Sequence, residues 1–264
     1  MPLAPGDLSG RSLLAVFAHP DDESLACGGL IAWCAQLGAQ VSLICATRGE
    51  QGPGKGEESG APLGDIRARE LEEAARVLGI AEIVQLGYPD GMLPWVDAAS
   101  LEADIREAIG RFRPEVVITF GEDGLYWHPD HIAVHQRTTA AVAALGDDAP
   151  ALYYVTLPHG SMRAIVDHAG LAASPLVFGL DADAFGAFAP PPTLVVDVGP
   201  FAIQKLAAIR CHRTQLAGEA LALVEEGNAA RFLGTEHFHR AEAGPHRVAF
   251  IERFTLQSAR SNEG

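Results

Sequence analysis

Residues 12–23, which read SLLAVFAHPDDE, decide how this chain begins to fold. The mostly apolar run 12–18 has the pattern of a strand that is buried on both faces of a parallel sheet. It stops abruptly at His19-Pro20, after which residues 23–38 carry apolar side chains at helical spacing and end near a glycine. A buried strand that passes through a short polar turn into a helix predicts the first half of a βαβ unit.

The same alternation continues outward from this stretch through the first two thirds of the chain. Further strands are predicted at 41–46, 82–86 and 115–120, and further helices at 65–78, 98–112 and about 132–145. Asp65 is placed to cap the first of these helices and Gly79 to end it. We therefore expect an α/β fold of right-handed βαβ units, with a parallel sheet covered by helices on both faces.

The pattern loosens from residue 151 onward. Strands are predicted at 151–157, 193–198 and 247–256, and a helix at 201–212. The sequence shows no repeats, no low-complexity linker and no second core of its own, so we expect one domain over residues 1–264. In this interpretation residues 1–150 form the core, and residues 151–264 complete the site, form a lid or supply an interface for a homo-oligomer.

Length and composition limit the class of protein. The 264 residues suffice for one large α/β domain, and 48% hydrophobic with 20% charged residues is typical of a folded globule. The 19 basic and 34 acidic side chains give a net charge of −15, which argues against binding to nucleic acid or an anionic membrane, because both require basic patches. No apolar run reaches ten residues, so no transmembrane segment is expected.

The compartment is predicted from the N-terminus and the cysteines. Residues 1–18 lead directly into the polar segment 19–23 instead of ending in the small residues of a signal-cleavage site. The four cysteines contain no CxxC pair and are interpreted as buried, reduced thiols. We therefore expect a cytoplasmic protein.

Polar clusters follow each of the first four predicted strands, at 19–23, 48–56, 88–92 and 122–131. The glycine-rich loop 48–64 is too long for a simple connection and is predicted to be functional. Ligands of parallel α/β sheets bind outside the carboxyl ends of the strands. The four loops are therefore expected to converge on one edge and to form a site there.

A metal site is predicted at this edge from His19, Asp22 and His131. His19 and Asp22 lie three residues apart in the strand-to-helix turn, and His131 ends the His-Pro-Asp-His segment 128–131. Two imidazoles and one carboxylate with an open position form the ligand set of a catalytic Zn²⁺ site, and Fe²⁺ is the alternative. Such a metal lowers the pKa of its water to about 7, which makes that water a nucleophile at neutral pH.

Four neighbouring residues are the predicted catalytic groups. Asp21 lies between two of the ligands and is expected to act as general base. His128 is placed to donate a proton or to stabilise an oxyanion, and Tyr126 to donate a hydrogen bond to the developing negative charge. Asp130 is expected to hold one imidazole in a defined tautomer.

Structural interpretations compete with these functional ones. His19-Pro20 is also a plausible turn, and the acidic residues 21–23 are also suited to capping the following helix. Cys27 and Cys34 share one helical face and are assigned to the core. His135 is interpreted as a packed helix residue, and His237 and His239 as surface or local structural residues.

The segment 18–23 with Gly28-Gly29, together with 128–131, resembles the two signature motifs of the PIG-L or LmbE-like family of zinc-dependent N-acetylglucosaminide deacetylases. Weaker similarity covers nearly the whole chain, at 47–50, 67–71, 78–79, 89–91, 205–215 and 236–238. The resemblance implies a Rossmann-like three-layer αβα fold with a mostly parallel sheet, whose core is residues 1–150.

The resemblance also implies roles for individual residues. His19, Asp22 and His131 would be metal ligands, Asp21 the base, and His128 the cationic acid or oxyanion stabiliser. Tyr126 would match a tyrosine that assists the carbonyl in some members. Asp90 and Arg67 resemble sugar-contacting positions, and Arg48 is either a third substrate contact in the same loop or a solvated arginine.

Three functions remain open at this point. The first is hydrolysis of the N-acetyl group of an amino sugar or its glycoconjugate, with a small-molecule substrate. The second keeps the metal and acts as an amidase on a thiol conjugate or another small amide. The third is a non-catalytic module that binds a sugar or nucleotide. The substrate, the pathway and the state of oligomerisation are not specified by the sequence.

Overall fold

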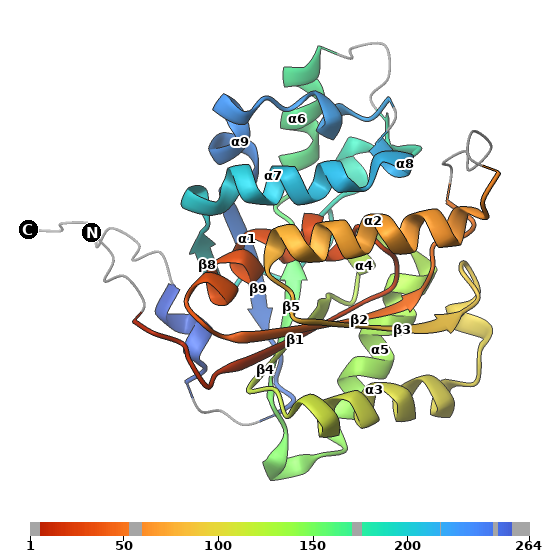
Figure 1. The fold of residues 1–264 in the computed structure, drawn as a ribbon, viewed down its shortest axis with the longest axis vertical. Helices are drawn as coiled ribbons and strands as arrows, with labels where there is room; N and C mark the ends of the chain where they lie inside the picture. Colours follow the sequence, from red (N-terminus) through yellow and green to blue (C-terminus); the bar gives the residue numbers. More distant parts are fainter. Residues whose placement is uncertain (1–5, 53–59, 171–175, 217, 245–247, 255–264) are drawn as a thin grey trace, which may run out of the picture.

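The fold is built on a seven-stranded, mostly parallel sheet. The computed structural model describes residues 6–52, 60–170, 176–216, 218–244 and 248–254. Its sheet has the order β3-β2-β1-β4-β5-β9-β8 (Figure 1). The strands are β1 (Ser12–Phe17), β2 (Gln40–Thr47), β3 (Glu82–Tyr88), β4 (Val116–Phe120), β5 (Ala151–Thr156), β8 (Leu194–Asp197) and β9 (Thr235–Arg240). β1 to β5 pair in parallel, and β9 runs antiparallel to both β5 and β8.

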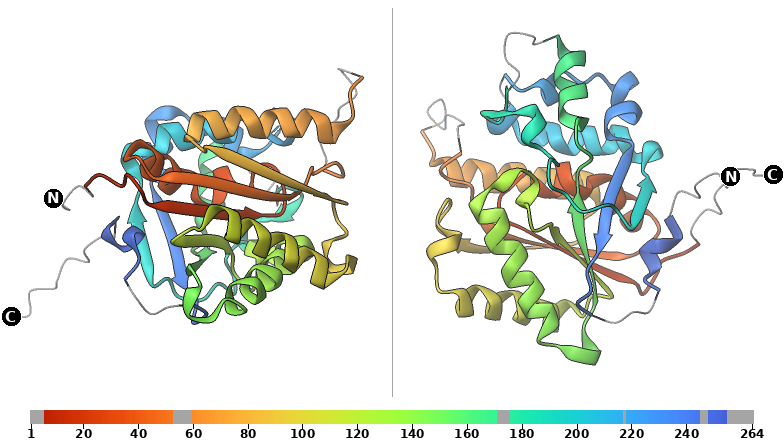
Figure 2. Two further views of the ribbon diagram at one scale, coloured as in Figure 1. Left: turned by 60° about the horizontal axis from the view of Figure 1, so that its bottom comes forward. Right: turned by 180° about the vertical axis from the view of Figure 1, so that it is seen from behind.

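Helices cover both faces of this sheet, as the βαβ alternation predicts. The helices are α1 (Asp22–Gln36), α2 (Leu63–Leu78), α3 (Ala98–Phe112), α4 (Gly124–Trp127), α5 (Pro129–Ala143), α6 (Ser161–Ala169), α7 (Ala202–Cys211), α8 (Arg213–Leu216) and α9 (Glu226–Leu233). Helices α1, α2 and α7 pack together on one face, and α3 packs on α5 on the other (Figures 1 and 2). The predicted three-layer α/β fold is confirmed.

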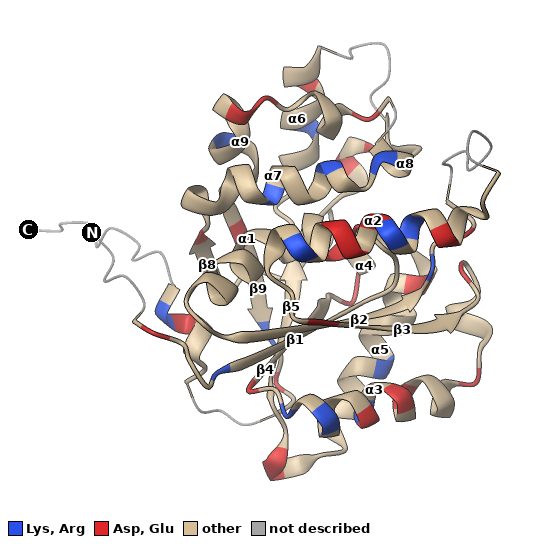
Figure 3. Ribbon diagram, viewed as in Figure 1, with Lys and Arg blue, Asp and Glu red and all other residues tan. Residues whose placement is uncertain are grey.

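Short elements complete the described chain. A two-stranded hairpin is formed by β6 (Leu176–Val177) and β7 (Leu180–Asp181). The 3₁₀ helices span Leu93–Trp95, Gly146–Asp148, Ala182–Ala184, Gly199–Phe201, Ala220–Leu223 and Phe250–Phe254. In the described part of the chain, every helix is too short or too polar to cross a membrane. Acidic and basic residues are interspersed along α2 and α3 (Figure 3).

Two local predictions were wrong, and one strand was not predicted. The strand expected at 247–256 is a 3₁₀ helix over Phe250–Phe254, and residues 247, 255 and 256 lie outside the described residues. Its buried residues are Phe250, Ile251 and Phe254, a spacing that favours a helix over a strand. β9 was not predicted, although Glu236 and Phe238 are buried at the two-residue period of a strand. Asp65 lies inside the first turn of α2, which begins two residues earlier, after Pro62.

The C-terminal third has a hydrophobic cluster of its own, which the sequence did not reveal. We call it the C-terminal cluster: Met162, Ile165, Val166, Val177, Ala182, Phe185, Ala202, Leu206, Ile209, Leu216, Ala220, Leu221, Val224, Ala229 and Leu233. Its residues come from α6 to α9, from β6 and from the segments between them, and α6 and α9 lie above α7 in Figure 1. This cluster brings residues from the last third of the chain to the carboxyl edge of the sheet.

Helix α1 is attached to the C-terminal part through Glu236 of β9, a buried carboxylate that also pairs with Lys205. The helix has a kink at Cys27, whose φ of −148° is not helical. The carboxylate of Glu236 accepts from the N–H groups of Gly29 and Leu30 at 2.8 and 2.9 Å, so strand β9 caps the second part of α1. Lys205 on α7 donates to the same carboxylate at 2.7 Å. The polar residues of β9 thus hold three elements together.

Candidate active site

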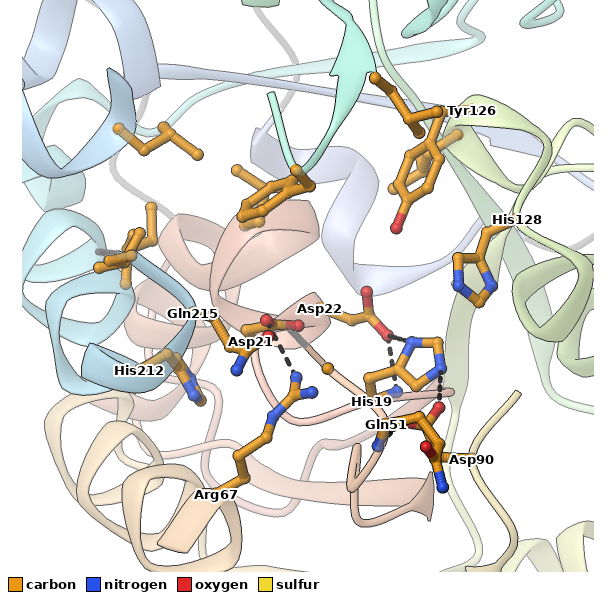
Figure 4. Close-up of a pocket in the computed structure, with 18 of the residues that line it drawn as sticks. His19, Asp21, Asp22, Gln51, Arg67, Asp90, Tyr126, His128, His212 and Gln215 are labelled. Atoms are coloured by element: carbon orange, nitrogen blue, oxygen red, sulfur yellow. Dashed lines mark hydrogen bonds and ion pairs between the residues drawn. The ribbon is translucent and has the colours of Figure 1, made fainter. Parts of the chain in front are cut away.

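A cavity of about 370 Å³ opens at the carboxyl edge of the sheet, where the four polar loops meet. Seven of the residues predicted for the site line it: His19, Asp21, Asp22, Arg67, Asp90, Tyr126 and His128. His131 and Asp130 have no exposed surface and contact His19, so they lie directly behind the lining. Nine of the ten predicted residues therefore lie together at this edge, and Figure 4 shows the seven that line the cavity.

The turn from β1 into α1 holds its aspartates in a strained geometry. Asp21 has a φ of 117°, a region that residues other than glycine rarely adopt. The turn is fixed on both sides of this residue: the N–H of His19 donates to Asp22 at 2.7 Å, and the N–H of Asp21 donates to Glu23 at 3.1 Å. Strain that surrounding contacts fix in this way is typical of functional sites.

Ligand atoms of His19, Asp22 and His131 face one another. Nδ1 of His19 lies 3.1 Å from Nε2 of His131 and 3.5 Å from Oδ2 of Asp22. Nε2 of His131 lies 3.3 Å from Oδ1 of Asp22. Ligand atoms placed tetrahedrally at 2.0–2.2 Å from Zn²⁺ are separated by about 3.3 Å. The spacing of the two imidazole nitrogens and the Asp22 carboxylate therefore suits one small divalent cation.

The tautomers of both imidazoles favour the same conclusion. Nδ1 of His131 faces the carbonyl oxygen of Gly124 at 3.1 Å, so it carries the proton and leaves Nε2 as a lone pair. Nε2 of His19 faces Asp90 at 3.1 Å and Asp130 at 3.3 Å, so it donates there and turns the lone pair of Nδ1 toward His131. Carboxylates behind a ligand imidazole are the usual companions of a metal site.

His131 and Asp22 have the ionisation of metal ligands, whereas His19 must lose a proton first. Burial lowers the pKa of His131 to about 3, so its imidazole stays neutral. Burial also acts to lower the pKa of His19, but the carboxylates of Asp130, Asp22 and Asp90 outweigh it and raise this pKa well above its usual value, so a bound cation displaces a proton from His19. Burial acts to raise the pKa of Asp22, but the imidazoles of His131 and His19 outweigh it and hold this pKa below its usual range. A neutral imidazole and an ionised carboxylate are the forms that bind cations.

Other combinations of donors exist around His19. Ligand atoms of His19, His128 and His131 also lie within reach of one another, as do those of His19, Asp90 and Asp130. The two aspartates of the second group are occupied: Asp130 accepts from the N–H groups of Gly91 and Leu93 at 2.8 and 3.0 Å. Asp90 accepts from the N–H of Gln51 at 2.8 Å. These contacts count against the second group. Between the set with His128 and the set with Asp22 we favour the latter, because the Asp22 carboxylate lies 3.3 Å from Nε2 of His131 and brings a negative charge toward a cation.

Asp21 and Arg67 form a pair beside these donors. Nη2 of Arg67 lies 3.2 Å from Oδ2 of Asp21, and the buried guanidinium also donates to the carbonyl oxygens of Pro20 and Gly49 at 2.6 and 2.7 Å. Burial raises the pKa of Asp21 to about 6, although Arg67 opposes it. A carboxyl with a raised pKa at the wall of a cavity is suited to accept and return a proton.

His128 and Tyr126 offer hydrogen-bond donors from the opposite side. The N–H of Asp130 donates to Nδ1 of His128 at 3.2 Å, so the neutral ring carries its proton on Nε2. Burial lowers the pKa of His128, and neighbouring His19 lowers it further, which favours this neutral donor over a cation. Burial raises the pKa of Tyr126 well above its usual value, and its hydroxyl points into the cavity (Figure 4).

The three residues predicted to contact the substrate have different surroundings in the structure. Arg67 lines the cavity, but its guanidinium is already bonded to Asp21 and the backbone. Asp90 lines the cavity and accepts from His19, so its carboxylate also orients an imidazole. Arg48 is not among the residues that line the cavity; it is exposed and pairs with Asp65 at 2.8 Å. Arg48 therefore has the position expected of a solvated arginine.

Sequence reasoning missed a second group of cavity residues. Gln51 follows β2, and His212 and Gln215 come from the region of α7 and α8. His212 pairs with Glu23 at 3.0 Å, and both side chains are buried. The segment 205–215 carries only weak similarity to the family, and a buried histidine at a helix end has no spacing signal of its own. The role of His212 is visible only in its contact with the first motif.

An α/β protein with a buried His/Asp cluster at the carboxyl edge of its sheet is the class that the fold and site define. Residues 14–142 match the model of the PIG-L family, described as GlcNAc-PI de-N-acetylase. A 1D-myo-inositol 2-acetamido-2-deoxy-alpha-D-glucopyranoside deacetylase from Nakamurella multipartita is 36% identical over 265 residues, a match that covers 88% of this chain and 89% of that relative. The chain belongs to the PIG-L family.

Solved structures agree with this assignment at the level of the fold. The conserved protein TT1542 from Thermus thermophilus has a TM-score of 0.58 and 27% identity, covering 89% of this chain and 96% of that one. GalB, the 4-carboxy-2-hydroxymuconate hydratase from Pseudomonas putida, has a TM-score of 0.64 and 20% identity, covering 90% and 98%. Because the second protein is a hydratase, the fold by itself does not specify the reaction.

Proposed function

We propose that this chain is a metal-dependent hydrolase that removes the N-acetyl group from an N-acetylglucosamine-type glycoconjugate, with Zn²⁺ or Fe²⁺ as the metal. The observation that carries the proposal is the meeting of three cation-binding donors in His19, Asp22 and His131 with a carboxylate beside them, Asp21. The family supports N-deacetylation as the reaction, and the relative's named substrate makes an inositol glycoside the first compound to test.

The reaction converts an amide and water into acetate and a free amine. When bound, a divalent cation at His19, Asp22 and His131 would supply Lewis acidity toward water and the amide carbonyl. Asp21 accepts the proton that the attacking water loses, and Arg67 holds the Asp21 carboxylate in place. Nε2–H of His128 and the hydroxyl of Tyr126 donate to the oxygen that becomes negative.

The amine must gain a proton before the C–N bond breaks. Asp21 holds the proton taken from water and lies at the wall of the same cavity, so it can return this proton to the nitrogen. His128 would be the alternative donor only as an imidazolium, the form that its lowered pKa disfavours, and it would then recover a proton from Asp21. The oxygen of water ends in the carboxyl group of the acetic acid, and the proton that Asp21 took from water ends on the amine.

The proposal is tested with purified protein loaded with Zn²⁺ and, separately, with Fe²⁺. We expect about one metal ion per chain and release of acetate from N-acetylglucosaminides, measured by an acetate-coupled assay. Asp21→Asn should lower kcat at least about 100-fold, the usual contribution of a positioned base. Arg48→Ala is the matched surface control and should leave kcat unchanged. Full activity of Asp21→Ala would rule out Asp21 as the base.

The amidase alternative is tested in the same assay. A thiol-conjugate amide or another small amide that is cleaved faster than every N-acetyl sugar would favour that function. Absence of both metal and acetate release, in protein that still binds sugars, would favour a binding module.

A further inference from the structure

The hairpin β6–β7 brings Phe178 to the wall of the cavity. Val177 pairs with Leu180 across the two strands, so Phe178 and Gly179 form a two-residue loop between them. Both loop residues have positive φ, 51° at Phe178 and 80° at Gly179. Positive φ at both positions is characteristic of a type I′ turn, in which Asn-Gly, Asp-Gly and Gly-Gly are strongly preferred. Phenylalanine therefore occupies a position that favours a small or polar residue.

The backbone of Phe178 is strained. A residue with a Cβ disfavours the left-handed region, and phenylalanine lacks the short polar side chain that lets asparagine and aspartate adopt it. The conformation is fixed from outside the hairpin, because the N–H of Phe178 donates to the carboxylate of Glu219 at 3.0 Å. Strain that surrounding contacts maintain in this way clusters at functional sites.

Positive φ at residues other than glycine is concentrated around this cavity. In the described part of the chain, five such residues occur: Asp21, Arg113, Leu125, Trp127 and Phe178. Asp21, Leu125 and Phe178 line the cavity, and Trp127 lies in the sequence between two further lining residues. Arg113 is at the C-terminal end of α3, where the left-handed conformation is common. Phe178 therefore shares its strain with residues of the site.

Packing is the competing explanation for the side chain of Phe178. The residue is half-buried and lies against the C-terminal cluster. The hairpin is already anchored there by its neighbour Val177, which is 1% exposed. A second anchor at the next position does not require an aromatic ring in a strained turn. Contact with a ligand in the cavity explains both the ring and the strain.

An aromatic ring in a largely polar cavity suits a ligand with two kinds of surface. Polar side chains line other parts of the same cavity, among them Gln51, Asp90 and Gln215 (Figure 4). A polyhydroxylated six-membered ring carries hydroxyls around its rim and C–H groups on its faces. Contact between such a face and an aromatic ring removes apolar surface from water and leaves the hydroxyls free to form hydrogen bonds.

We propose that Phe178 contacts the substrate, with its ring against the C–H face of a polyhydroxylated six-membered ring of the glycoconjugate. This inference rests on the proposed function, in which the amide of the substrate lies beside Asp21 in the same cavity. The contacted ring is either the amino sugar or a polyol attached to its glycosidic oxygen, since both present the same C–H face. The contact is equal in the ground state and the transition state, so it contributes to binding and not to the chemical step.

Two variants of Phe178 and one matched control separate ligand contact from packing. Phe178→Asn removes the ring and suits the turn, so its midpoint of urea unfolding should equal or exceed that of wild type. Phe178→Tyr keeps the aromatic face. Phe232 is also a half-buried phenylalanine on the C-terminal cluster, but it is not among the lining residues. Phe232→Asn should lower the urea midpoint and leave substrate binding unchanged.

The two probes are methyl 2-acetamido-2-deoxy-α-D-glucopyranoside, which has one ring, and the corresponding 1D-myo-inositol glycoside, which has two. With Zn²⁺-loaded protein in the acetate assay, we expect Phe178→Asn to raise KM about tenfold and to leave kcat unchanged. Phe178→Tyr and Phe232→Asn should retain the wild-type KM. A rise for both probes assigns the contact to the amino sugar, and a rise for the inositol glycoside alone assigns it to the polyol.

Calorimetry with the amine forms of both glycosides, which have no acetyl group to lose, separates this inference from the proposed function. Unchanged KM and Kd in Phe178→Asn, with acetate still released, would overturn the inference and leave the deacetylase intact. Weaker binding in Phe178→Asn, without acetate release by wild type from any glycoside, would support the ring contact and contradict the proposed function. An equal loss of affinity in Phe178→Tyr, or a fall in kcat with unchanged KM, would assign Phe178 to the shape of the site and overturn the contact.

Discussion

Nε2 of His212 donates to Oε1 of Glu23 across 3.0 Å, although 189 residues separate them in the chain. Each of the two side chains is 1% exposed. The second oxygen of Glu23 accepts from the N–H of Asp21, the residue with the strained φ of 117°. The end of α7 therefore acts, through Glu23, on the backbone conformation of the proposed base. His212 is in this sense a positioning residue.

Replacement of His212 tests this relationship. His212→Leu removes the imidazole that faces buried Glu23 and leaves only the Ser24 hydroxyl and the N–H of Asp21 as donors, so we expect a loss of about 3–5 kcal/mol in the free energy of unfolding. His212→Gln keeps an N–H donor and should retain more of that stability. At a temperature where both variants are folded, kcat of the leucine variant should fall about 10- to 100-fold, with a smaller change in KM, because the base is displaced. Wild-type stability and kcat in the leucine variant would show that the pair does not hold Asp21.

The adjacent glycines of α1 make a second, sharper comparison. A Cβ at Gly29 would lie 2.6 Å from Cβ and Cγ2 of Val198, whereas the nearest atom to a Cβ at Gly28 is Cγ of Lys205 at 3.4 Å. We expect Gly29→Ala to lower the free energy of unfolding by roughly 1–3 kcal/mol, the usual effect of overpacking. Gly28→Ala should be neutral or slightly stabilising, because alanine is the better helix former.

The two glycine variants are compared by urea unfolding at one pH. Because the two positions are neighbours in one helix, the comparison addresses the close approach of Gly29 to Val198, just after β8, and to Oε1 of Glu236. Equal stabilities of the two variants would mean that Val198 moves aside at little cost. The close approach would then not explain why position 29 is a glycine.

Asp130 is expected to control metal affinity without touching the metal. Its carboxylate accepts from the backbone N–H groups of Gly91 and Leu93 and faces Nε2 of His19 at 3.3 Å. Asp130→Asn replaces one acceptor oxygen by an amide donor, so these contacts cannot all be kept. We expect Zn²⁺ affinity to fall about 10- to 100-fold, measured by competition with a chromophoric chelator. Asp65→Asn, in an exposed pair, is the control; equal affinities in the two variants would contradict the orienting role.

The first two thirds of the fold could be predicted because the strands and helices of βαβ units have recognisable local patterns of apolar residues. Buried parallel strands give apolar runs, and the helices between them give the 3.6-residue period. The rule that ligands bind at the carboxyl edge then places the loops with His19, Asp90 and His131 together from the sequence alone. The contacts among these residues agree with that placement.

The C-terminal third was harder because its elements are short and its contacts are distant in sequence. In β9 the charged residue Glu236 is buried, so the strand lacks the usual alternation of apolar and polar residues. The burial of Glu236 is explained by its contacts with Lys205 and with the backbone of α1, which are distant in sequence. Leu216 and Leu221 reach the cavity through the packing of several short helices, which no local period records. Arg48 was proposed as a possible site residue because it begins the polar loop after β2, but its side chain pairs with Asp65 and does not line the cavity.

His135 provides a prediction about pH that is separate from the catalytic chemistry. The half-buried ring donates from Nδ1 to the carbonyl oxygen of Phe120 at 2.9 Å, and its edge lies against Tyr154. Burial lowers the pKa of His135 below the unfolded value of 6.5, although the Phe120 carbonyl opposes this. As pH falls below about 6.5, the unfolded chain binds a proton at this residue before the folded chain does. The contribution of His135 to stability is therefore present above pH 6.5 and is lost as pH falls through its folded pKa.

His135→Gln removes this titration and keeps a polar side chain. Urea unfolding at pH 7 and pH 5 should show that wild type loses more stability than His135→Gln between the two pH values. Gln136→Ala, a substitution at an exposed neighbour without a titratable group, should follow wild type. Parallel losses in wild type and His135→Gln would mean that the proton binds equally well in both states, which the burial of the ring against Tyr154 argues against.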